Sequence, residues 1–86
     1  MNQPAVVMYA TNWCPYCERV RKVLATKNVT IEEIDIESAP EKRVEMHNRS
    51  GRRSVPQIFI GDHHVGGSDD LLALEAAGKL DGLLGR

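Results

Sequence analysis

Cys14 and Cys17 are the side chains of this 86-residue chain best suited to covalent chemistry, and they are its only cysteines. A β-forming apolar run at 5–9 precedes the pair, and apolar side chains recur at helical spacing over 15–27. Cys14 is therefore expected at or next to the N-cap of a helix, where unpaired backbone N–H groups and the helix dipole favour a thiolate. Because the thiolate is the nucleophile, we predict that Cys14 attacks and that Cys17, nearly one turn further along, resolves the mixed disulfide.

Two other uses of a cysteine pair fit the sequence less well. A structural disulfide across two residues would close too small a loop to constrain the unfolded chain much. A structural zinc site needs two more ligands, and His47, His63 and His64 show no finger-like spacing with the cysteines. A strand, a Cys-x-x-Cys pair and a helix in this order instead favour thiol–disulfide redox chemistry.

Charge and composition narrow the remaining possibilities. Eleven basic residues stand against twelve acidic ones, for a net charge of −1, which offers no argument for a nucleic acid or an anionic membrane. No apolar run approaches the roughly 20 residues of a membrane helix, and residues 1–4 lack the basic start of a signal peptide. Since a Cys-x-x-Cys pair suits a reducing cytosol, we predict a cytoplasmic single domain over residues 1–86 with no nucleic-acid or membrane partner.

Turn and cap signals divide the rest of the chain into short elements. Ser38 is expected to cap a helix that ends at Gly51, with Pro40 in its first turn. Ser68 is expected to cap a later helix that ends at Gly78. A strand–helix–strand unit makes the first two strands parallel, so we expect an α/β fold in the order β-α-β-α-β-β-α. Its four-stranded mixed sheet, in the order 2-1-3-4 with helices on both faces, is expected to use strands at 5–9, 30–36, 57–60 and 63–65.

Two further stretches are placed to contact a ligand. Pro56 directly precedes an expected strand and has two interpretations. It marks the first residue of that strand, or a cis Val55–Pro56 bond turns the backbone groups of Val55 outward towards a peptide-like substrate. Gly66 and Gly67 precede the helix start at Ser68, where close approach of an anionic group to free N–H donors would explain both glycines.

Three motifs, taken with the element order, resemble the dithiol class of glutaredoxin, in particular its small bacterial members, from residue 6 to residue 84. The resemblance implies a thioredoxin-like fold and a glutathione-dependent thiol–disulfide oxidoreductase that reduces protein disulfides and glutathione mixed disulfides. It also implies a monomer with no metal and no tightly bound cofactor. Its expected partners are glutathione, as co-substrate, and disulfide-bonded or glutathionylated proteins, with ribonucleotide reductase as one candidate. The motifs are Cys14-Pro15-Tyr16-Cys17, Ser54-Val55-Pro56 and Gly66-Gly67-Ser68-Asp69-Asp70.

The same resemblance implies a glutathione site. Cys14 would form the mixed disulfide beside Tyr16, and the backbone of Val55 would pair with the cysteinyl part of glutathione. The start of the helix at 68 would hold the γ-glutamyl end, and Arg52, with Arg53, would attract the glycyl carboxylate. The residues expected to contact glutathione are Thr11, Tyr16, Arg52, Val55, Pro56, Gly67, Ser68 and Asp69.

The sequence departs from the family pattern at two positions. The family usually carries a lysine three residues before the first cysteine, where this chain has Thr11. One positive charge that would stabilise the thiolate and contact glutathione is therefore absent. Trp13, directly before Cys14, is more typical of thioredoxin. Thioredoxin itself is disfavoured, because the chain is too short for its extra N-terminal elements and because Pro-Tyr separates the cysteines in place of Gly-Pro.

Two alternatives to this enzyme stay open. One is an iron–sulfur binding module, in which Cys14 of two protomers and two glutathiones would hold a cluster. Relatives of that kind tend to have glycine or serine at the position of Pro15. The other is a glutaredoxin-shaped redoxin reduced by thioredoxin reductase, which would lack a glutathione-binding stretch such as 66–70.

Overall fold

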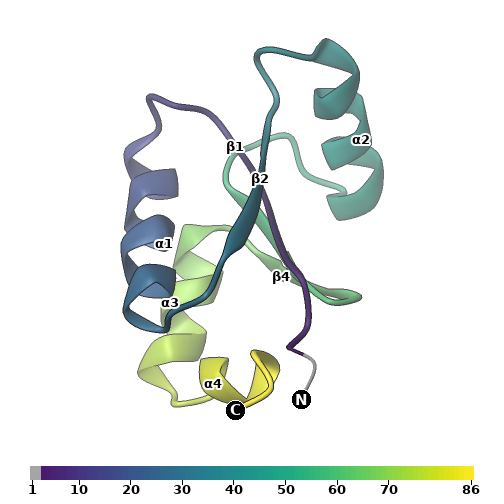
Figure 1. Ribbon diagram of the computed structural model, residues 1–86. Helices are drawn as coiled ribbons and strands as arrows, with labels where there is room; N and C mark the ends of the chain where they lie inside the picture. The colour runs from purple at the N-terminus through teal and green to yellow at the C-terminus, as the bar shows by residue number, and fades with distance from the viewer. Residues whose placement is uncertain (1–2) are drawn as a thin grey trace.

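A four-stranded sheet in the order β2-β1-β3-β4 forms the centre of the structure (Figure 1). The computed structural model describes residues 3–86. Met1 and Asn2 belong to the expected domain and to the N-terminal stretch that lacks the pattern of a signal peptide, and both lie outside the described residues. The sheet order and the element order confirm the expectation from the sequence. The strands are β1 (Val6–Ala10), β2 (Ile31–Asp35), β3 (Gln57–Ile60) and β4 (His63–Gly66), and the helices are α1 (Pro15–Thr26), α2 (Pro40–Ser50), α3 (Ser68–Ala76) and α4 (Leu80–Leu83).

β1 is the central strand that positions the cysteine pair. It pairs parallel with β2, in a register that places Val6 opposite Ile31, and antiparallel with β3, where Val6 lies opposite Ile60. All four residues of β3 are buried, since helices cover both faces of the sheet at this point. The edge strand β2 instead carries the exposed Glu32 and Glu33, which suits an edge that must not pair with another chain.

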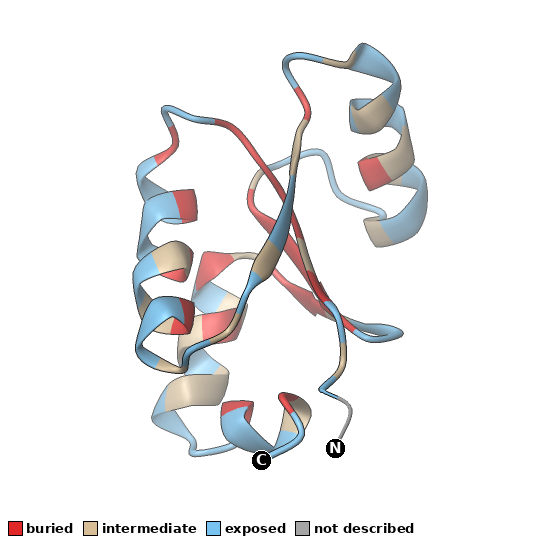
Figure 2. Cartoon of the chain, viewed as in Figure 1, coloured by how far each residue is buried: buried red, intermediate tan, exposed pale blue. Residues whose placement is uncertain are grey.

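The two faces of the sheet carry cores of different size. α1, α3 and α4 cover one face, and α2 covers the other (Figure 1). The α1 side buries thirteen residues in one cluster, whereas the α2 side buries four: Tyr9, Ile36, Met46 and Phe59. The small core leaves α2 exposed along most of its length, as Figure 2 shows. Met46 is the one buried residue among its eleven.

Polar contacts supplement the small core beneath α2. The Tyr9 hydroxyl donates to the Glu45 carboxylate, and Arg49 donates to the same hydroxyl at 2.8 Å. The Arg49 guanidinium also lies 4.1 Å from the ring centroid of Phe59, at cation–π distance. α2 is therefore attached to the sheet by one buried methionine and a charged network at its edge.

The helix caps agree with the sequence in part. The helix expected to end at Gly51 does so, with Gly51 in the left-handed conformation at φ 74°, and Asn28 after α1 is also left-handed at φ 57°. The expected Ser38 cap is wrong, because α2 has Ala39 as its N-cap and the Ser38 hydroxyl donates to the Asp35 carbonyl at 3.3 Å. Pro40 already fixes the backbone at the first helical position, so the helix begins without a side-chain cap.

The expected Ser68 cap is also wrong. Gly67 is the N-cap of α3 and Ser68 is the first helical residue. The Asp70 carboxylate takes the capping role, because it accepts a hydrogen bond from the Gly67 N–H at 2.8 Å. A carboxylate is a stronger acceptor than a hydroxyl at the positive end of a helix.

Candidate active site

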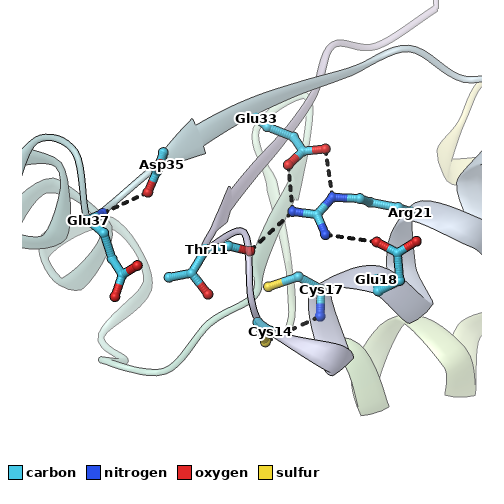
Figure 3. Close-up of polar contacts among 8 residues, drawn as sticks. All are labelled: Thr11, Cys14, Cys17, Glu18, Arg21, Glu33, Asp35 and Glu37. Carbon is cyan, nitrogen blue, oxygen red and sulfur yellow. Dashed lines mark hydrogen bonds and ion pairs between the residues drawn. The ribbon is translucent and has the colours of Figure 1, made fainter.

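Cys14 lies where β1 ends and α1 begins. It is the N-cap of α1, with Pro15 at the first helical position, as the sequence predicts. The Cys17 N–H donates to the Cys14 sulfur at 3.4 Å, one of the contacts drawn as dashed lines in Figure 3. The Cys14 thiol also makes a long contact, 3.9 Å, with the Val55 carbonyl across the sheet end. Both cysteines are free thiols, so the pair is in its reduced form.

Cys17 has a different environment. Its side chain is fully buried in the core on the α1 side of the sheet. Burial raises the pKa of the Cys17 thiol to about 11, opposed by a backbone hydrogen bond from Thr11, while the neighbouring Cys14 raises it further. Cys17 therefore keeps its proton at neutral pH, and as a thiol it is a poor nucleophile.

A groove of about 300 Å³ gathers most of the residues expected to contact glutathione. Cys14 is buried, with 5% of its surface exposed, and adjoins the groove through Val55, a lining residue whose carbonyl lies 3.9 Å from the Cys14 sulfur. A groove of this volume is at the lower end of the range for small-molecule sites. Ser54 and Asp70 line it as well, although the sequence analysis gave them no role there. The Val55–Pro56 peptide bond in its wall is cis. The lining residues are Tyr16, Arg52, Ser54, Val55, Pro56, Gly67, Ser68, Asp69 and Asp70.

The start of α3 supplies hydrogen-bond donors to this groove. The first N–H groups of a helix have no partner within it, and here they belong to Ser68 and Asp69. The Ser68 hydroxyl is buried and has no hydrogen-bond partner among residues 3–86. An unpaired buried hydroxyl beside free N–H groups can accept and donate to a polar ligand.

Arg52 and Asp70 form an ion pair at the rim of the groove, with 2.9 Å between Nη1 and Oδ2. The Gly67 N–H and Arg52 both lower the pKa of the Asp70 carboxyl, the Gly67 hydrogen bond more strongly. A Cβ on Gly66, which has φ +116°, would collide with the Asp70 carboxylate. The glycine at 66 is therefore required by the chain's own aspartate, whereas the sequence analysis attributed it to a ligand.

Thr11 and Arg53 lie apart from the groove. Thr11 is buried, with 2% of its surface exposed, and its hydroxyl has no hydrogen-bond partner within the described part of the chain. Arg53 faces a different hollow with Arg43 and His47. Of the two neighbouring arginines, Arg52 alone lines the groove beside Cys14.

A cluster of charged side chains around Arg21 lies near the cysteine pair (Figure 3). The sequence patterns did not predict it. Arg21 binds the Glu33 carboxylate with two hydrogen bonds of 2.9 and 2.8 Å, and Glu18 at 3.1 Å. It also donates to the Thr11 carbonyl at 3.3 Å, and its charge lowers the pKa of Cys17. Its position four residues after Cys17, on the same helix face, is the signal that could have identified it.

Within residues 3–86 the structure contains no group of three or more His, Cys, Asp or Glu side chains able to hold a metal ion. The neighbouring histidines have different surroundings. His64 forms a hydrogen bond with the Gln57 side chain at 2.8 Å, whereas His63 is exposed at the β3–β4 hairpin. The same residues include no helix that combines the length and the apolar character needed to cross a bilayer.

Comparison with known proteins identifies the class. The sheet order and the cysteine pair at a helix start define a thioredoxin-like fold, and solved structures agree. The solution structure of glutaredoxin from Brucella melitensis matches with a TM-score of 0.85 at 52% identity, over 98% of this chain and 91% of that one. The crystal structure of a buckwheat glutaredoxin–glutathione complex matches with a TM-score of 0.86 at 28% identity, over 95% of this chain and 76% of that one.

Sequence comparison identifies the family. The family model described as Glutaredoxin matches residues 6–65. A curated glutaredoxin from Pseudomonas aeruginosa is 54% identical over 81 residues, which cover 94% of this chain and 96% of the relative. The chain therefore belongs to the glutaredoxin family and has its thiol redox function.

Proposed function

We propose that this protein is a glutathione-dependent thiol–disulfide oxidoreductase, which reduces protein disulfides and glutathione mixed disulfides through Cys14 and Cys17. The observation that carries the proposal is the groove beside the Cys14 sulfur, with the donor-rich start of α3 in its wall. The structurally similar buckwheat glutaredoxin was crystallised as a glutathione complex, which supports the same ligand here.

Glutathione fits this groove with its sulfur towards Cys14. The backbone of Val55 pairs with the cysteinyl part, and Tyr16 flanks the disulfide. The γ-glutamyl carboxylate accepts hydrogen bonds from the first N–H groups of α3, and the Asp69 carboxylate binds the γ-glutamyl amine. Arg52 attracts the glycyl carboxylate, in competition with its present partner Asp70. Thr11 is too deeply buried for its side chain to take a direct part in this arrangement.

The monothiol route needs Cys14 alone. The Cys14 thiolate attacks the glutathione sulfur of a glutathionylated protein, so that a Cys14–glutathione disulfide forms and the protein sulfur leaves as a thiolate that takes up a proton. A second glutathione, as thiolate, then attacks the glutathione sulfur held on Cys14. The products are oxidised glutathione and the Cys14 thiolate. The attacking glutathione is oxidised as the protein sulfur is reduced, and the glutathione transferred from the protein keeps its oxidation state.

The dithiol route adds Cys17. Cys14 attacks a protein disulfide and forms a mixed disulfide with one protein sulfur, while the other leaves as a thiolate. Cys14 then carries no charge, so its two contributions that raise the pKa of Cys17 disappear. Cys17 now loses its proton more easily and attacks the Cys14 sulfur. The second protein thiolate leaves and a Cys14–Cys17 disulfide remains for glutathione to reduce.

One assay decides between this proposal and a redoxin served by thioredoxin reductase. The purified protein is supplied with a glutathionylated substrate and with either glutathione plus glutathione reductase or thioredoxin reductase, and NADPH consumption is followed. We expect turnover with the glutathione system. Turnover with thioredoxin reductase alone would contradict the proposal.

A further inference from the structure

A second hollow, of about 350 Å³, lies on the exposed side of α2. We call it the basic hollow, because Arg43, His47 and Arg53 line it around the side chain of Val44. Val44 is 60% exposed and is one of three large apolar side chains that are exposed among residues 3–86; the other two are Trp13, directly before Cys14, and Tyr16, between the two cysteines. The basic hollow therefore combines positive charge with an apolar contact surface, and the redox chemistry described above makes no use of it.

The positive charge of the basic hollow is not neutralised by the chain itself. Neither Arg43 nor Arg53 forms an ion pair with another of the residues 3–86. Arg52, by contrast, is paired with Asp70. Glu45, an acid on the same helix, is engaged by Tyr9 and Lys42. In a chain with a net charge of −1, this is a local excess of unpaired positive charge, which attracts anionic partners.

The basic hollow lies close to the reactive sulfur. Arg52 lines the groove beside Cys14 and the next residue, Arg53, lines the basic hollow, so the two sites share one loop. Arg53 is two residues from Val55, whose carbonyl lies 3.9 Å from the Cys14 sulfur. Because consecutive Cα atoms are about 3.8 Å apart, the path from the Cys14 sulfur through Val55 to the Arg53 Cα is about 10 Å, and the path to the end of the Arg53 side chain is at most about 20 Å. An extended polypeptide covers that distance with about three to six residues.

We propose that the basic hollow docks an acidic segment of the protein substrate, about three to six residues from the cysteine that Cys14 attacks. The proposal rests on the proposed function, because it needs a protein disulfide or a glutathionylated protein at Cys14. Arginine forks bind carboxylates with paired hydrogen bonds. Arg43 and Arg53 thus select Asp or Glu, and Val44 accepts an apolar side chain between them. The site acts on substrate choice, and the chemistry at the sulfur is unchanged.

The test uses glutathionylated peptides with a single cysteine, assayed for deglutathionylation with glutathione and glutathione reductase. One peptide carries Glu-Leu-Glu at four to six residues from the cysteine, the second carries Ser-Leu-Ser there, and the third carries Glu-Leu-Glu ten residues further away. We expect kcat/KM for the first peptide to exceed that of the other two by about three- to tenfold at low salt, mainly through KM. The preference should shrink as the ionic strength rises.

Arg43→Glu is the decisive variant, and Lys22→Glu, an exposed charge reversal on α1, is its matched control. Arg43→Glu should abolish the preference for the acidic peptide, whereas Lys22→Glu should keep it. Both should match the natural protein on a small glutathione mixed disulfide, which also shows that they fold. Equal loss in the two variants, or no preference in the natural protein, would overturn the docking site alone.

Two further outcomes are informative. Absence of turnover on the small mixed disulfide in the natural protein would overturn the proposed function and the docking site together. A cysteine-free acidic peptide should inhibit turnover of the first peptide, and a short single-stranded RNA should not. Equal inhibition by the RNA would overturn the assignment of the basic hollow to a protein segment.

Discussion

Cys14 and Cys17 are three positions apart, and both are buried, with 5% and 0% of their surfaces exposed, yet the structure gives them different contacts. Cys14 is the N-cap of α1, opposite the Val55 carbonyl, next to an open groove. Cys17 lies inside the core and is fully buried, with its pKa raised to about 11 by that burial. The Cys14 sulfur accepts the Cys17 N–H and contacts the Val55 carbonyl, whereas the Cys17 side chain has no exposed surface.

The contrast shows how helix geometry divides the chemistry between two identical side chains. Residues three apart point to the same face of a helix but lie almost one turn apart along it. That separation is enough to place the Cys14 sulfur at the start of α1, where it accepts the Cys17 N–H, and the Cys17 side chain fully inside the core. We therefore propose that Cys14 attacks, and that Cys17 resolves once the mixed disulfide has removed the two effects of Cys14 that raise the Cys17 pKa.

Replacing Cys14 should have the largest effect. Cys14→Ser removes the nucleophile, and a serine hydroxyl does not ionise near neutral pH. We expect loss of activity by at least about a hundredfold on every substrate, measured with glutathione reductase as the coupling enzyme. Circular dichroism of the variant is the control for folding. Residual activity comparable to that of the natural protein would show that Cys17 can attack unaided.

Replacing Cys17 should stop the dithiol route and leave the monothiol route active. Cys17→Ser keeps the attacking thiolate but removes the thiol that releases a protein mixed disulfide. We expect deglutathionylation to persist within a few-fold and reduction of protein disulfides to fall to the level of glutathione alone. The comparison of the two sulfurs fails if this variant is as inactive on a glutathionylated substrate as Cys14→Ser.

Asp69→Ala should act on the groove and leave the sulfur unchanged. The Asp69 carboxylate is exposed in the groove wall, so its loss should raise the KM for glutathione about three- to tenfold and affect attack on a small disulfide less. Asp62→Ala, an exposed aspartate in the β3–β4 turn, is the matched control. Equal loss with both substrates would indicate a folding defect at the start of α3.

The burial of Cys17 should also appear in the stability of the reduced protein. Its folded-state pKa of about 11 lies above the ordinary value of 9.0, so above pH 9 the unfolded chain releases a proton that the folded protein keeps. The unfolded state then binds fewer protons, and stability falls as the pH rises from about 9 to about 11, on the order of 1–2 kcal/mol. Urea unfolding under reducing conditions measures this loss, and Cys17→Ser should lack it. Identical pH profiles for the two proteins would contradict the environment assigned to Cys17.

The sequence predicts the parts of this site that depend on local rules. The spacing of apolar residues and Pro15 places Cys14 at a helix start. The strand–helix–strand unit makes the first two strands parallel, and the short separation of the strands expected at 57–60 and 63–65 makes them antiparallel neighbours. These signals act over a few residues and are not altered by the rest of the fold. The proposed roles of the two thiols rest on them.

Tertiary contacts decide the remaining features, and they have no local signature. Asp70 displaces Ser68 as the cap because its carboxylate reaches back to Gly67 and is held by Arg52, eighteen residues away in sequence. The link from Arg21 to Glu33 joins α1 to β2 and becomes visible only in the folded chain. Likewise, the sequence does not specify that Arg52 faces the groove while its neighbour faces the basic hollow. The glutathione contacts, the monomeric state and the cytoplasmic location stay predictions.

The central claim, that Cys14 attacks and Cys17 resolves, is tested most directly by locating the first covalent intermediate. Each single-cysteine variant is mixed with a glutathionylated protein, quenched in acid after a short interval and mapped by mass spectrometry. The account predicts glutathione on Cys14 in Cys17→Ser, and an unmodified Cys17 in Cys14→Ser at pH 7. Glutathione on Cys17 at a comparable rate would contradict it.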